Sequence, residues 1–176
     1  MNPTKLSRPA SSEYKPSYDA YIGPVADQDA LDLLARQKTA LDGLRTLDES
    51  RALHRYAPGK WSVKEVIGHV ADAERIFSYR MLRIARGDKT PLANFDQEPY
   101  IEAAGFDRFP VGQLVDAYHA TRNSTLSIAN EIDADGWSRM GVAGDAPVSA
   151  RAIAYVIAGH AAHHFGILRD KYRLTL

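Results

Sequence analysis

The stretch from Ser62 to Asp88 constrains the fold more than any other part of the chain, because its apolar residues recur at the spacing of one α-helical face. Ser62 and Glu65 form a capping-box pattern at its start, in which each side chain satisfies the other's free backbone N–H group. Gly87 and Asp88 then end the pattern. The apolar positions between these ends are Val63, Val66, Ile67, Val70, Phe77, Met81 and Ile84. We therefore predict a long helix with one buried face.

Three further segments have the same spacing of apolar residues and are predicted to be helices. One lies at about 27–47, and another begins near Val111. The last follows Ser149, whose side chain suits the N-cap position, and continues to Tyr172. The apolar positions that define these helices include Leu31, Leu34, Leu41 and Leu44, then Leu114, Val115, Tyr118, Leu126 and Ala129, and finally Ile153, Val156, Ile157, Ile167 and Leu168.

The connections complete the predicted architecture. A long connection follows the second helix and contains a short helix at about 99–104, and a glycine-rich loop, GWSRMGVAGDAPV, precedes the fourth helix. No alternating strand pattern of useful length is present. We therefore predict an all-α fold, a four-helix bundle with a long crossover connection between helices 2 and 3. The lengths of the connections leave the up-or-down order of the helices open.

Length and composition narrow the class of protein. The chain has 176 residues, which suits one domain, and residues 1–25 are expected to form an extended N-terminal arm over it. Basic and acidic residues number 22 each, so no overall basic surplus favours nucleic acid as a partner. No apolar stretch approaches the length of a membrane span and the N-terminus lacks an apolar signal core, so we expect a cytoplasmic protein without a membrane partner. Because cysteine is absent, any metal must be held by His, Asp or Glu.

The segment GHAAHHFGIL, residues 159–168, places three histidines on the fourth predicted helix. Residues three or four apart share a helical face, so His160 and His164 fall near the middle of the apolar face and His163 falls toward its edge. Two imidazoles four residues apart can converge on one metal ion. The alternative is that they are ordinary core histidines whose ring nitrogens bond a carbonyl group or a side chain. The pattern on this helix alone leaves both possibilities open.

His69 on the second helix strengthens the metal hypothesis. It lies on the flank of the apolar stripe, beside Val66 and Ala73. Ligand sites in helical bundles are built in the core by residues of facing helices. One histidine from the second helix and two from the fourth would form a three-histidine site that leaves positions open for water or substrate. His119 on the third helix and His54 in a loop are weaker candidates.

Glu74 and Arg122 each fall near the centre of an apolar helix face, where neither belongs alone. We hypothesise that they pair inside the bundle. The alternative is that the two faces are rotated enough to leave both side chains half exposed. Gly159, next to the histidine pair, could let a neighbouring helix approach the site closely, because it has no side chain.

Other polar residues are candidates for a supporting role. Glu65 and Asp72 face solvent by the helical count, although either could lean toward the histidine of the second helix as a hydrogen-bond acceptor. Asp96, Glu98 and Tyr100 lie in the long connection, which could cover the site and supply acid–base or substrate contacts. The alternative is an ordinary solvated loop. None of these residues is assigned as the catalytic base from the sequence.

Two long segments resemble the DinB/YfiT-like family of bacterial metal-binding proteins. They are APGKWSVKEVIGHVADAERIFSYRMLRIARGDKTPL and SARAIAYVIAGHAAHHFGILRDKY. The Lys-Trp-Ser start followed by Gly-His, together with Gly-His-x-x-His-His, makes the combination fairly specific. The YIGPV segment before the first helix and the Gly-Trp-x-Arg-x-Gly loop before the fourth extend the resemblance over nearly the whole chain.

The resemblance implies a single DinB-like domain over residues 1–176 and a divalent metal ion held by three histidines. Position by position, the metal ligands fall on His69, His160 and His164. His163 matches a position that is commonly histidine in this motif but is not a ligand. The resemblance also implies zinc, nickel or a similar ion, and a homodimer.

The activities implied by the resemblance are the metal-dependent transfer of small thiols to electrophiles, thiol-dependent isomerisation, and hydrolysis. We therefore expect a thiol S-transferase or a hydrolase that acts on a small molecule, with a metal-activated thiol or water. Because the chain has no cysteine, a thiol such as bacillithiol or glutathione would have to be a co-substrate. The alternative is a non-catalytic bundle in which the metal only joins two helices.

Overall fold

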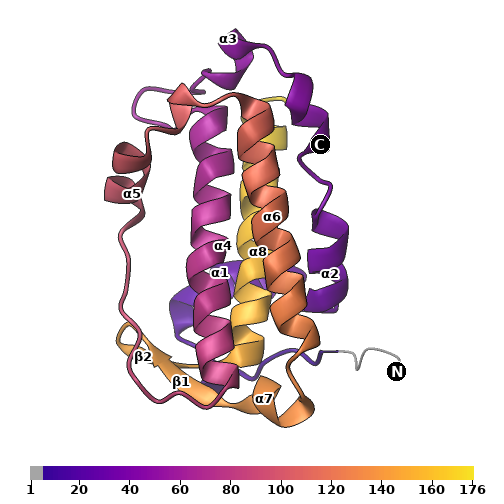
Figure 1. Cartoon of the computed structure of the whole chain (residues 1–176), viewed down its shortest axis with the longest axis vertical. Helices are drawn as coiled ribbons and strands as arrows, with labels where there is room; N and C mark the ends of the chain where they lie inside the picture. The colour runs from indigo at the N-terminus through magenta and orange to yellow at the C-terminus, as the bar shows by residue number, and fades with distance from the viewer. Residues whose placement is uncertain (1–5) are drawn as a thin grey trace.

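Four helices form the body of the computed structural model, which describes residues 6–176 (Figure 1). They are α2 (Ala30–Gln37), α4 (Val63–Ala85), α6 (Val111–Asn130) and α8 (Ala150–Asp170). The three long helices stand side by side, and the shorter α2 packs against α6 and α8. The predicted four-helix bundle is confirmed. Among the helices of the described residues, none combines the length and apolar character that a membrane span requires.

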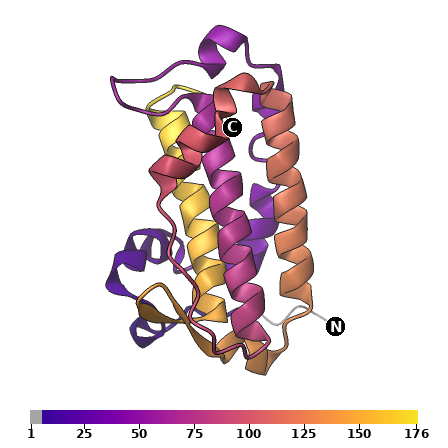
Figure 2. The same cartoon turned by 60° about the vertical axis from the view of Figure 1, so that its left-hand side comes forward.

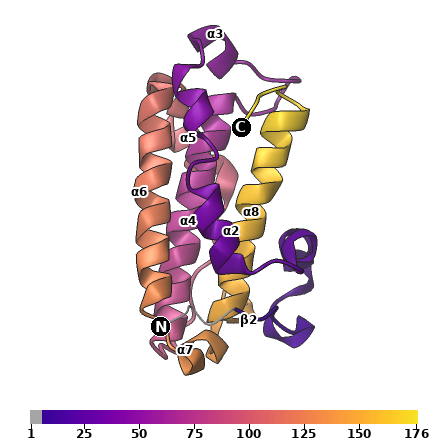
Figure 3. The ribbon, with the colours of Figure 1, turned by 90° about the vertical axis from the view of Figure 1, so that its right-hand side faces the viewer.

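The direction of each helix is set by the crossover. Helices α4 and α6 run in the same direction, whereas α2 and α8 run in the opposite one (Figures 1 and 3). A tight turn cannot join two parallel helices, so the chain returns along the bundle between Arg86 and Pro110. This return carries α5 (Gln97–Ala104), close to the predicted short helix. The predicted crossover is confirmed, and the structure decides the order that the sequence left open.

The helix ends form where local signals predict them. The Ser62 hydroxyl accepts a hydrogen bond from the N–H of Glu65, and the Glu65 carboxylate accepts one from the N–H of Ser62, so the predicted capping box is present. The Ser149 hydroxyl caps α8, and the Asp96 carboxylate caps α5. These side chains satisfy backbone groups that a helix end leaves unpaired.

The prediction of one helix at about 27–47 is wrong. The structure divides this part of the chain into α2 and a 3₁₀ helix η4 (Asp42–Thr46), and a further short helix, α3 (Glu49–Ala52), follows it. Helix α2 ends where side chains of α6 take its last carbonyl groups: Arg122 donates to Leu34 and Tyr118 donates to Gln37. The leucine spacing indicated burial but could not show that another helix would supply these caps.

A β-hairpin in the glycine-rich loop corrects the expectation that no strand is present. Strands β1 (Met140–Ala143) and β2 (Ala146–Ser149) pair antiparallel after a short helix, α7 (Ala134–Ser138). Gly144 and Asp145 form the two-residue turn, and Gly144 has a φ of 67°, which glycine adopts readily. A bridge from Leu92 to Ala143 fastens the crossover to the hairpin. Strands of four residues are too short to produce a recognisable alternation.

The N-terminal arm is only partly extended, which corrects the prediction for residues 1–25. Residues 1–5 lie outside the described part, and the rest contains η1 (Ser11–Glu13), η2 (Pro16–Tyr18), α1 (Asp19–Ile22) and η3 (Gly23–Val25). The arm packs against α8 (Figure 2). A Cβ atom added at Gly159 would lie 2.1 Å from the carbonyl oxygen of Tyr21. The predicted close approach at Gly159 is therefore present, and the approaching element is the arm.

A polar layer crosses the core between two apolar clusters. The first cluster contains buried apolar residues from Ala73 onward on α4 and up to Ala158 on α8. The second contains those up to Ala71 on α4 and from Ala161 onward on α8. The polar side chains buried near this level are Gln37, His69, Glu74, Arg122 and His160. Two groups of buried polar residues, one ionic and one of histidines, therefore lie in the middle of the bundle.

The predicted pair of Glu74 and Arg122 is confirmed. Two parallel bonds join them, Nε to Oε1 at 2.7 Å and Nη2 to Oε2 at 2.8 Å, and both side chains are buried. The third nitrogen, Nη1, donates to the Leu34 carbonyl and to Gln37 Oε1. Burial alone would lower the pKa of Arg122, but the hydrogen bonds to Glu74 outweigh it and raise this pKa. All three guanidinium nitrogens and both carboxylate oxygens therefore have partners within the protein.

Candidate metal centre

The three predicted histidines converge where α4 and α8 pack against each other. Nε2 of His69 lies 3.1 Å from Nε2 of His160, and one ring nitrogen from each of His69, His160 and His164 lies within 4.8 Å of the others. Their ring centroids are 4.5–5.0 Å apart. The antiparallel packing of the two helices brings the single histidine of α4 opposite the i, i+4 pair of α8. The structure thus places the predicted site residues together.

These histidines lack the partners that core histidines normally have. Their exposed fractions are 3%, 6% and 7% for His69, His160 and His164. Nδ1 of His164 is fully buried and has no hydrogen-bond partner among the described residues. The Nε2 atoms of His69 and His160 face each other, so only one of them can donate when both rings are neutral. Unpaired buried nitrogens cost free energy, and a metal ion satisfies them together, so this donor set fits a divalent metal.

Burial keeps the three rings in the neutral form. It lowers the pKa of His69 to about 4 and that of His160 to about 3, where nearby His69 and His163 add to the effect. Burial also moves the pKa of His164 far below its usual range, again with help from the neighbouring histidines. A neutral imidazole has the free lone pair that metal ligation requires.

Aromatic side chains from two segments lie against the histidines. The Trp61 ring lies 4.7 Å from the His69 ring and stacks on the His164 ring at 6.1 Å, with an interplanar angle of 19°. Tyr21 of the arm presents an edge contact to the His160 ring at 5.3 Å. The sequence analysis gave Trp61 and Tyr21 no role, although both lie in segments that carry the family resemblance.

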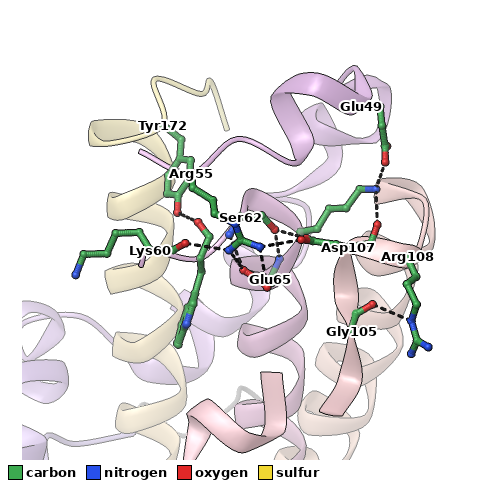
Figure 4. A network of polar contacts seen from close by, with 11 residues as sticks. Glu49, Arg55, Lys60, Ser62, Glu65, Gly105, Asp107, Arg108 and Tyr172 are labelled. Atoms are coloured by element: carbon green, nitrogen blue, oxygen red, sulfur yellow. Dashed lines mark hydrogen bonds and ion pairs between the residues drawn. The ribbon is translucent and has the colours of Figure 1, made fainter. Parts of the chain in front are cut away.

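A polar network at the start of α4 holds the segment that carries Trp61 (Figure 4). Arg55 donates to the Lys60 carbonyl and bonds both Glu65 and Asp107. The Tyr172 hydroxyl donates to the carbonyl of Trp61 itself. Burial alone would raise the pKa of Glu65, but its hydrogen bonds from Arg55 and the Ser62 backbone outweigh this and lower the pKa. The network therefore fixes the indole ring beside the histidines.

Two hollows reach the histidines. The first, which we call the arm cleft, has a volume of about 420 Å³ and lies between the N-terminal arm, α4 and the crossover. His69 and His160 form part of its lining. The second, which we call the indole pocket, has a volume of about 220 Å³ and is lined by Trp61 and His164 among others. The histidine cluster is thus buried but lies next to space that a small molecule could occupy.

Among the described residues, the other histidines are not part of the group that could share one metal ion. His163 is exposed on α8, and its ring centroid lies 5.1 Å from that of His164 and 5.8 Å from that of Tyr21. Nε2 of His119 lies 3.0 Å from the Asp42 carboxylate, and His54 is exposed in the loop before α4. His163 therefore lies at the edge of the cluster, as its helical position predicts, whereas His119 and His54 are not brought to the site.

The supporting carboxylates are divided between the site and the surface. Asp72 pairs with Arg75, and Glu65 belongs to the network above, so neither is seen to bond His69. Both are half-buried rather than fully exposed. Asp96 lines the arm cleft, whereas Glu98 lines the indole pocket and accepts a hydrogen bond from Trp61 Nε1 at 3.3 Å.

Residues of the crossover line both hollows, Gln97 among them, which favours a connection that covers the site over an ordinary solvated loop. Tyr100 is about half exposed and packs on Phe95, with ring centroids 5.5 Å apart. It does not line either hollow. From the sequence, a cover over the site was one of two possibilities for the connection, and no pattern showed which of its side chains turn inward.

The fold and the site define a class of protein, a four-helix bundle with a buried three-histidine centre that suits a divalent metal. The sequence matches the model of the DinB superfamily over residues 32–168, so the chain belongs to this superfamily. No curated protein matches the chain in sequence.

Two solved structures are similar in fold. YfiT from Bacillus subtilis, described as a probable metal-dependent hydrolase with an unusual four-helix bundle topology, aligns with a TM-score of 0.70 and 16% identity over 97% of each chain. A mycothiol-dependent maleylpyruvate isomerase aligns with a TM-score of 0.63 and 17% identity, over 77% of this chain and 57% of the isomerase. At these identities the likeness shows a shared fold.

Proposed function

We propose that this protein is a divalent-metal-dependent enzyme that acts on a small molecule, with His69, His160 and His164 as the metal ligands. Zinc and nickel both suit a set of imidazole ligands. A divalent ion held there would lower the pKa of a water molecule or a small thiol and so supply a nucleophile at neutral pH. The reaction would be the transfer of a thiol to an electrophile or a hydrolysis.

The observation that carries this proposal is that the arm cleft reaches His69 and His160. A metal that only joins two helices needs no space for a substrate, and its site normally closes with a fourth protein ligand. Among the described residues, the group of potential ligands contains the three histidines alone. Three ligands beside a cleft favour catalysis over the alternative of a purely structural metal.

The two hollows favour a thiol S-transferase over a hydrolase. A transferase must hold a thiol and an electrophile at once, and the arm cleft and the indole pocket are two spaces that are each lined by histidines of the cluster. A hydrolase needs only one such space, since water is its second reactant. The thiol would come from a co-substrate, because the chain has no cysteine. The hydrolase remains the second candidate, supported by the description of YfiT.

Within this proposal, Asp96 is the residue that accepts the proton of the nucleophile. It is the carboxylate that lines the arm cleft with the two histidines, and its Oδ1 is held by the N–H of Glu98 at 3.2 Å. Asp96→Asn keeps the N-cap of α5, because asparagine and aspartate cap helices about equally well. We expect this variant to lose roughly 100-fold in kcat while its Tm stays within about 2 °C of the wild type. A variant with full activity would exclude Asp96 as the base.

The test of the proposed function begins with metal content. Protein purified without a histidine tag should bind about one equivalent of zinc or nickel, and His69→Ala should bind neither. The metal-loaded protein is then assayed for conjugation of glutathione and bacillithiol to 1-chloro-2,4-dinitrobenzene, and for hydrolysis of a panel of esters and amides. Loss of activity on chelation, with recovery when metal is restored, is the expected result. Activity that survives complete chelation would contradict both reactions.

A further inference from the structure

Arg80 is a buried arginine that faces the arm cleft. It lies on α4, its exposed fraction is 3%, and it belongs to the lining that includes His69 and His160. One guanidinium nitrogen, Nη2, donates to the carbonyl of Ala93. The guanidinium carbon lies 5.6 Å from the centroid of the Phe77 ring and 5.8 Å from that of Phe95. The positive charge is therefore held between two aromatic rings at the wall of the cleft.

No carboxylate neutralises this charge. Among residues 6–176, no Asp or Glu oxygen lies within ion-pair distance of Arg80. The two other cations that are similarly buried both have such a partner: Arg122 pairs with Glu74, and Lys64 pairs with Glu49. Burial lowers the pKa of Arg80 and the nearby Tyr18 only partly opposes this, but arginine stays charged in proteins. A buried unpaired charge is costly, so its place in the cleft indicates that an anion completes it.

The rest of the arm cleft suits an anion that has an apolar body. Its walls include the aromatic residues Tyr18, Tyr21, Phe77 and Phe95, and its charged groups are Lys15, Arg80 and Asp96. The Lys15 ammonium group lies 5.1 Å from the Tyr18 ring centroid. The cleft therefore contains two cations against one carboxylate, and that carboxylate caps α5. Aromatic walls with a net positive charge select an organic anion over a neutral or cationic ligand.

The Phe77 ring lies between the arginine and the histidines. Its centroid is 6.0 Å from the His160 ring and 5.6 Å from the Arg80 guanidinium carbon. A ligand that touches both ends of the cleft must therefore pass along this ring. Its anionic group and its reacting group would be separated by an apolar body about as large as one aromatic ring.

We propose that Arg80 binds the carboxylate of a small organic acid whose apolar body lies along Phe77 and whose reacting group lies at His69 and His160. A guanidinium group can bind a carboxylate through two parallel hydrogen bonds, which fixes the orientation of the acid as well as its position. The role of the histidines in the reaction rests on the function proposed above. The binding of the acid to Arg80 does not, because the charge and the aromatic walls belong to the chain itself.

The competing explanation is that Arg80 only anchors the crossover through the Ala93 carbonyl. In that case the residue would matter for stability, and the cleft would not distinguish an acid from its neutral amide. A carboxylate could also bind directly to the metal, and then Arg80 would not matter for affinity. A comparison of an acid with its neutral amide, on the wild type and on variants of Arg80, separates these cases.

Isothermal titration of the zinc-loaded protein with 3-phenylpropionate and with 3-phenylpropanamide gives the first comparison. The two probes have the same apolar body and differ only in the charge of the head group. We expect the acid to bind at least about tenfold more tightly than the amide, which is the size expected for one charge-assisted pair of hydrogen bonds. Equal affinity for the two probes, or no binding of the acid at millimolar concentration, would overturn the proposal.

Variants of two arginines on α4 then test where the carboxylate of the acid binds. Arg80→Gln should lose at least about tenfold in affinity for the acid and almost nothing for the amide, while Arg80→Lys should show a smaller loss because it keeps the charge without the paired geometry. Arg75→Gln is the matched control, since Arg75 is an exposed arginine of the same helix that pairs with Asp72. It should bind the acid as the wild type does. If Arg80→Gln still binds the acid with full affinity, the carboxylate is on the metal and the proposal is wrong.

Measurements of stability and titrations without metal distinguish a loss of acid binding from a loss of the fold or of the metal. The Tm of each variant is measured, and if Arg80→Gln does not fold, the comparison of acid with amide on the wild type and on Arg80→Lys decides the question. The titration is repeated on protein freed of metal by chelation, where binding that depends on Arg80 should persist. A protein that takes up no metal but still prefers the acid would refute the proposed function alone. A protein that binds metal but shows no preference would refute the proposed acid site alone.

Discussion

The middle of the bundle contains two buried polar groups that differ in how they are satisfied. Glu74 and Arg122 bond each other and the groups around them, so every charged atom has a partner from the chain. The cluster of His69, His160 and His164 lies at the same boundary between the two apolar clusters of the core. The Nε2 atoms of His69 and His160 face each other, and Nδ1 of His164 has no partner among the described residues. The hydrogen bonds of the first group are complete within the protein, whereas the second group leaves a buried nitrogen without a partner in the described part of the chain.

This difference separates a structural role from a functional one. Buried polar groups that are satisfied by the chain hold elements together, as Arg122 does when it joins α4, α6 and the end of α2. Buried groups that are left unsatisfied reduce stability, and they persist where an ion or a ligand completes them. Arg80 in the arm cleft follows the same rule as the histidines, since it too is buried without a neutralising partner.

The largest expected effect comes from breaking the ionic group. Glu74→Leu and Arg122→Met should each lower the free energy of unfolding by about 3–5 kcal/mol, because each leaves a buried charge unpaired. The double variant should lose much less, because no charge then remains. Urea unfolding of the three variants and the wild type measures these differences. A double variant whose loss equals the sum of the two single losses would show that the two residues act independently.

In contrast to the ion pair, the histidine cluster should lose little stability when one member is replaced in the metal-free protein, and its main loss should be stabilisation by metal. Zinc at about 100 times its Kd should raise the free energy of unfolding of the wild type by about 2.7 kcal/mol. His69→Leu should lose this stabilisation, yet its metal-free form should be close to wild type in stability, since an unpaired polar ring is replaced by an apolar side chain. His163→Gln is the control, because His163 is exposed on the same helix as two of the proposed ligands. Zinc stabilisation of His69→Leu equal to that of the wild type would exclude His69 as a ligand.

The contact between the arm and the histidine region gives a third comparison. Gly159→Ala should lower the free energy of unfolding by about 1–3 kcal/mol, because the new Cβ would overlap the Tyr21 carbonyl oxygen. Gly166→Ala should be neutral or stabilising by up to about 1 kcal/mol, since its Cβ would meet nothing closer than 3.8 Å. Thermal unfolding of both variants measures the difference. A neutral Gly159→Ala would show that the arm does not depend on this close approach.

The pH dependence of the metal-free protein gives a fourth comparison. The folded pKa of His69, about 4, and that of His160, about 3, lie below the unfolded value of 6.5. The unfolded chain therefore binds more protons below pH 6.5, and stability falls as the pH falls, by about 1.4 kcal/mol per pH unit for each histidine. Urea unfolding between about pH 5 and 7.5 should show this slope, and His69→Leu should show a shallower one. A flat profile in the wild type would contradict the burial of neutral rings.

The elements with strong local signals could be predicted from the sequence. The capping box at Ser62 and Glu65 and the cap at Ser149 form as predicted, because each depends on residues within one helical turn. The pairing of Glu74 with Arg122 could also be predicted, since each residue was charged and near the centre of an apolar face. The grouping of the three histidines followed from helical spacing together with the family resemblance.

The errors have a common cause in contacts between distant segments. Helix α2 ends early because Tyr118 and Arg122 of another helix take its carbonyl groups. The β-hairpin forms from two strands of four residues, one of which is also joined to Leu92 of the crossover. Arg80 had no signal as a binding residue, because its apolar surroundings come from the arm and the crossover as well as from its own helix.

The sequence by itself determined the three long helices, their buried faces and the set of imidazole donors, because spacing along one helix is a local property. Only the tertiary structure decided that α4 and α6 run in parallel, and that the arm and the crossover enclose a cleft at the histidines. It also decided which buried polar groups find partners, since a partner can come from any segment that packs nearby. Hydrogen bonding in the core depends on where every chain segment lies, and no local pattern contains that information.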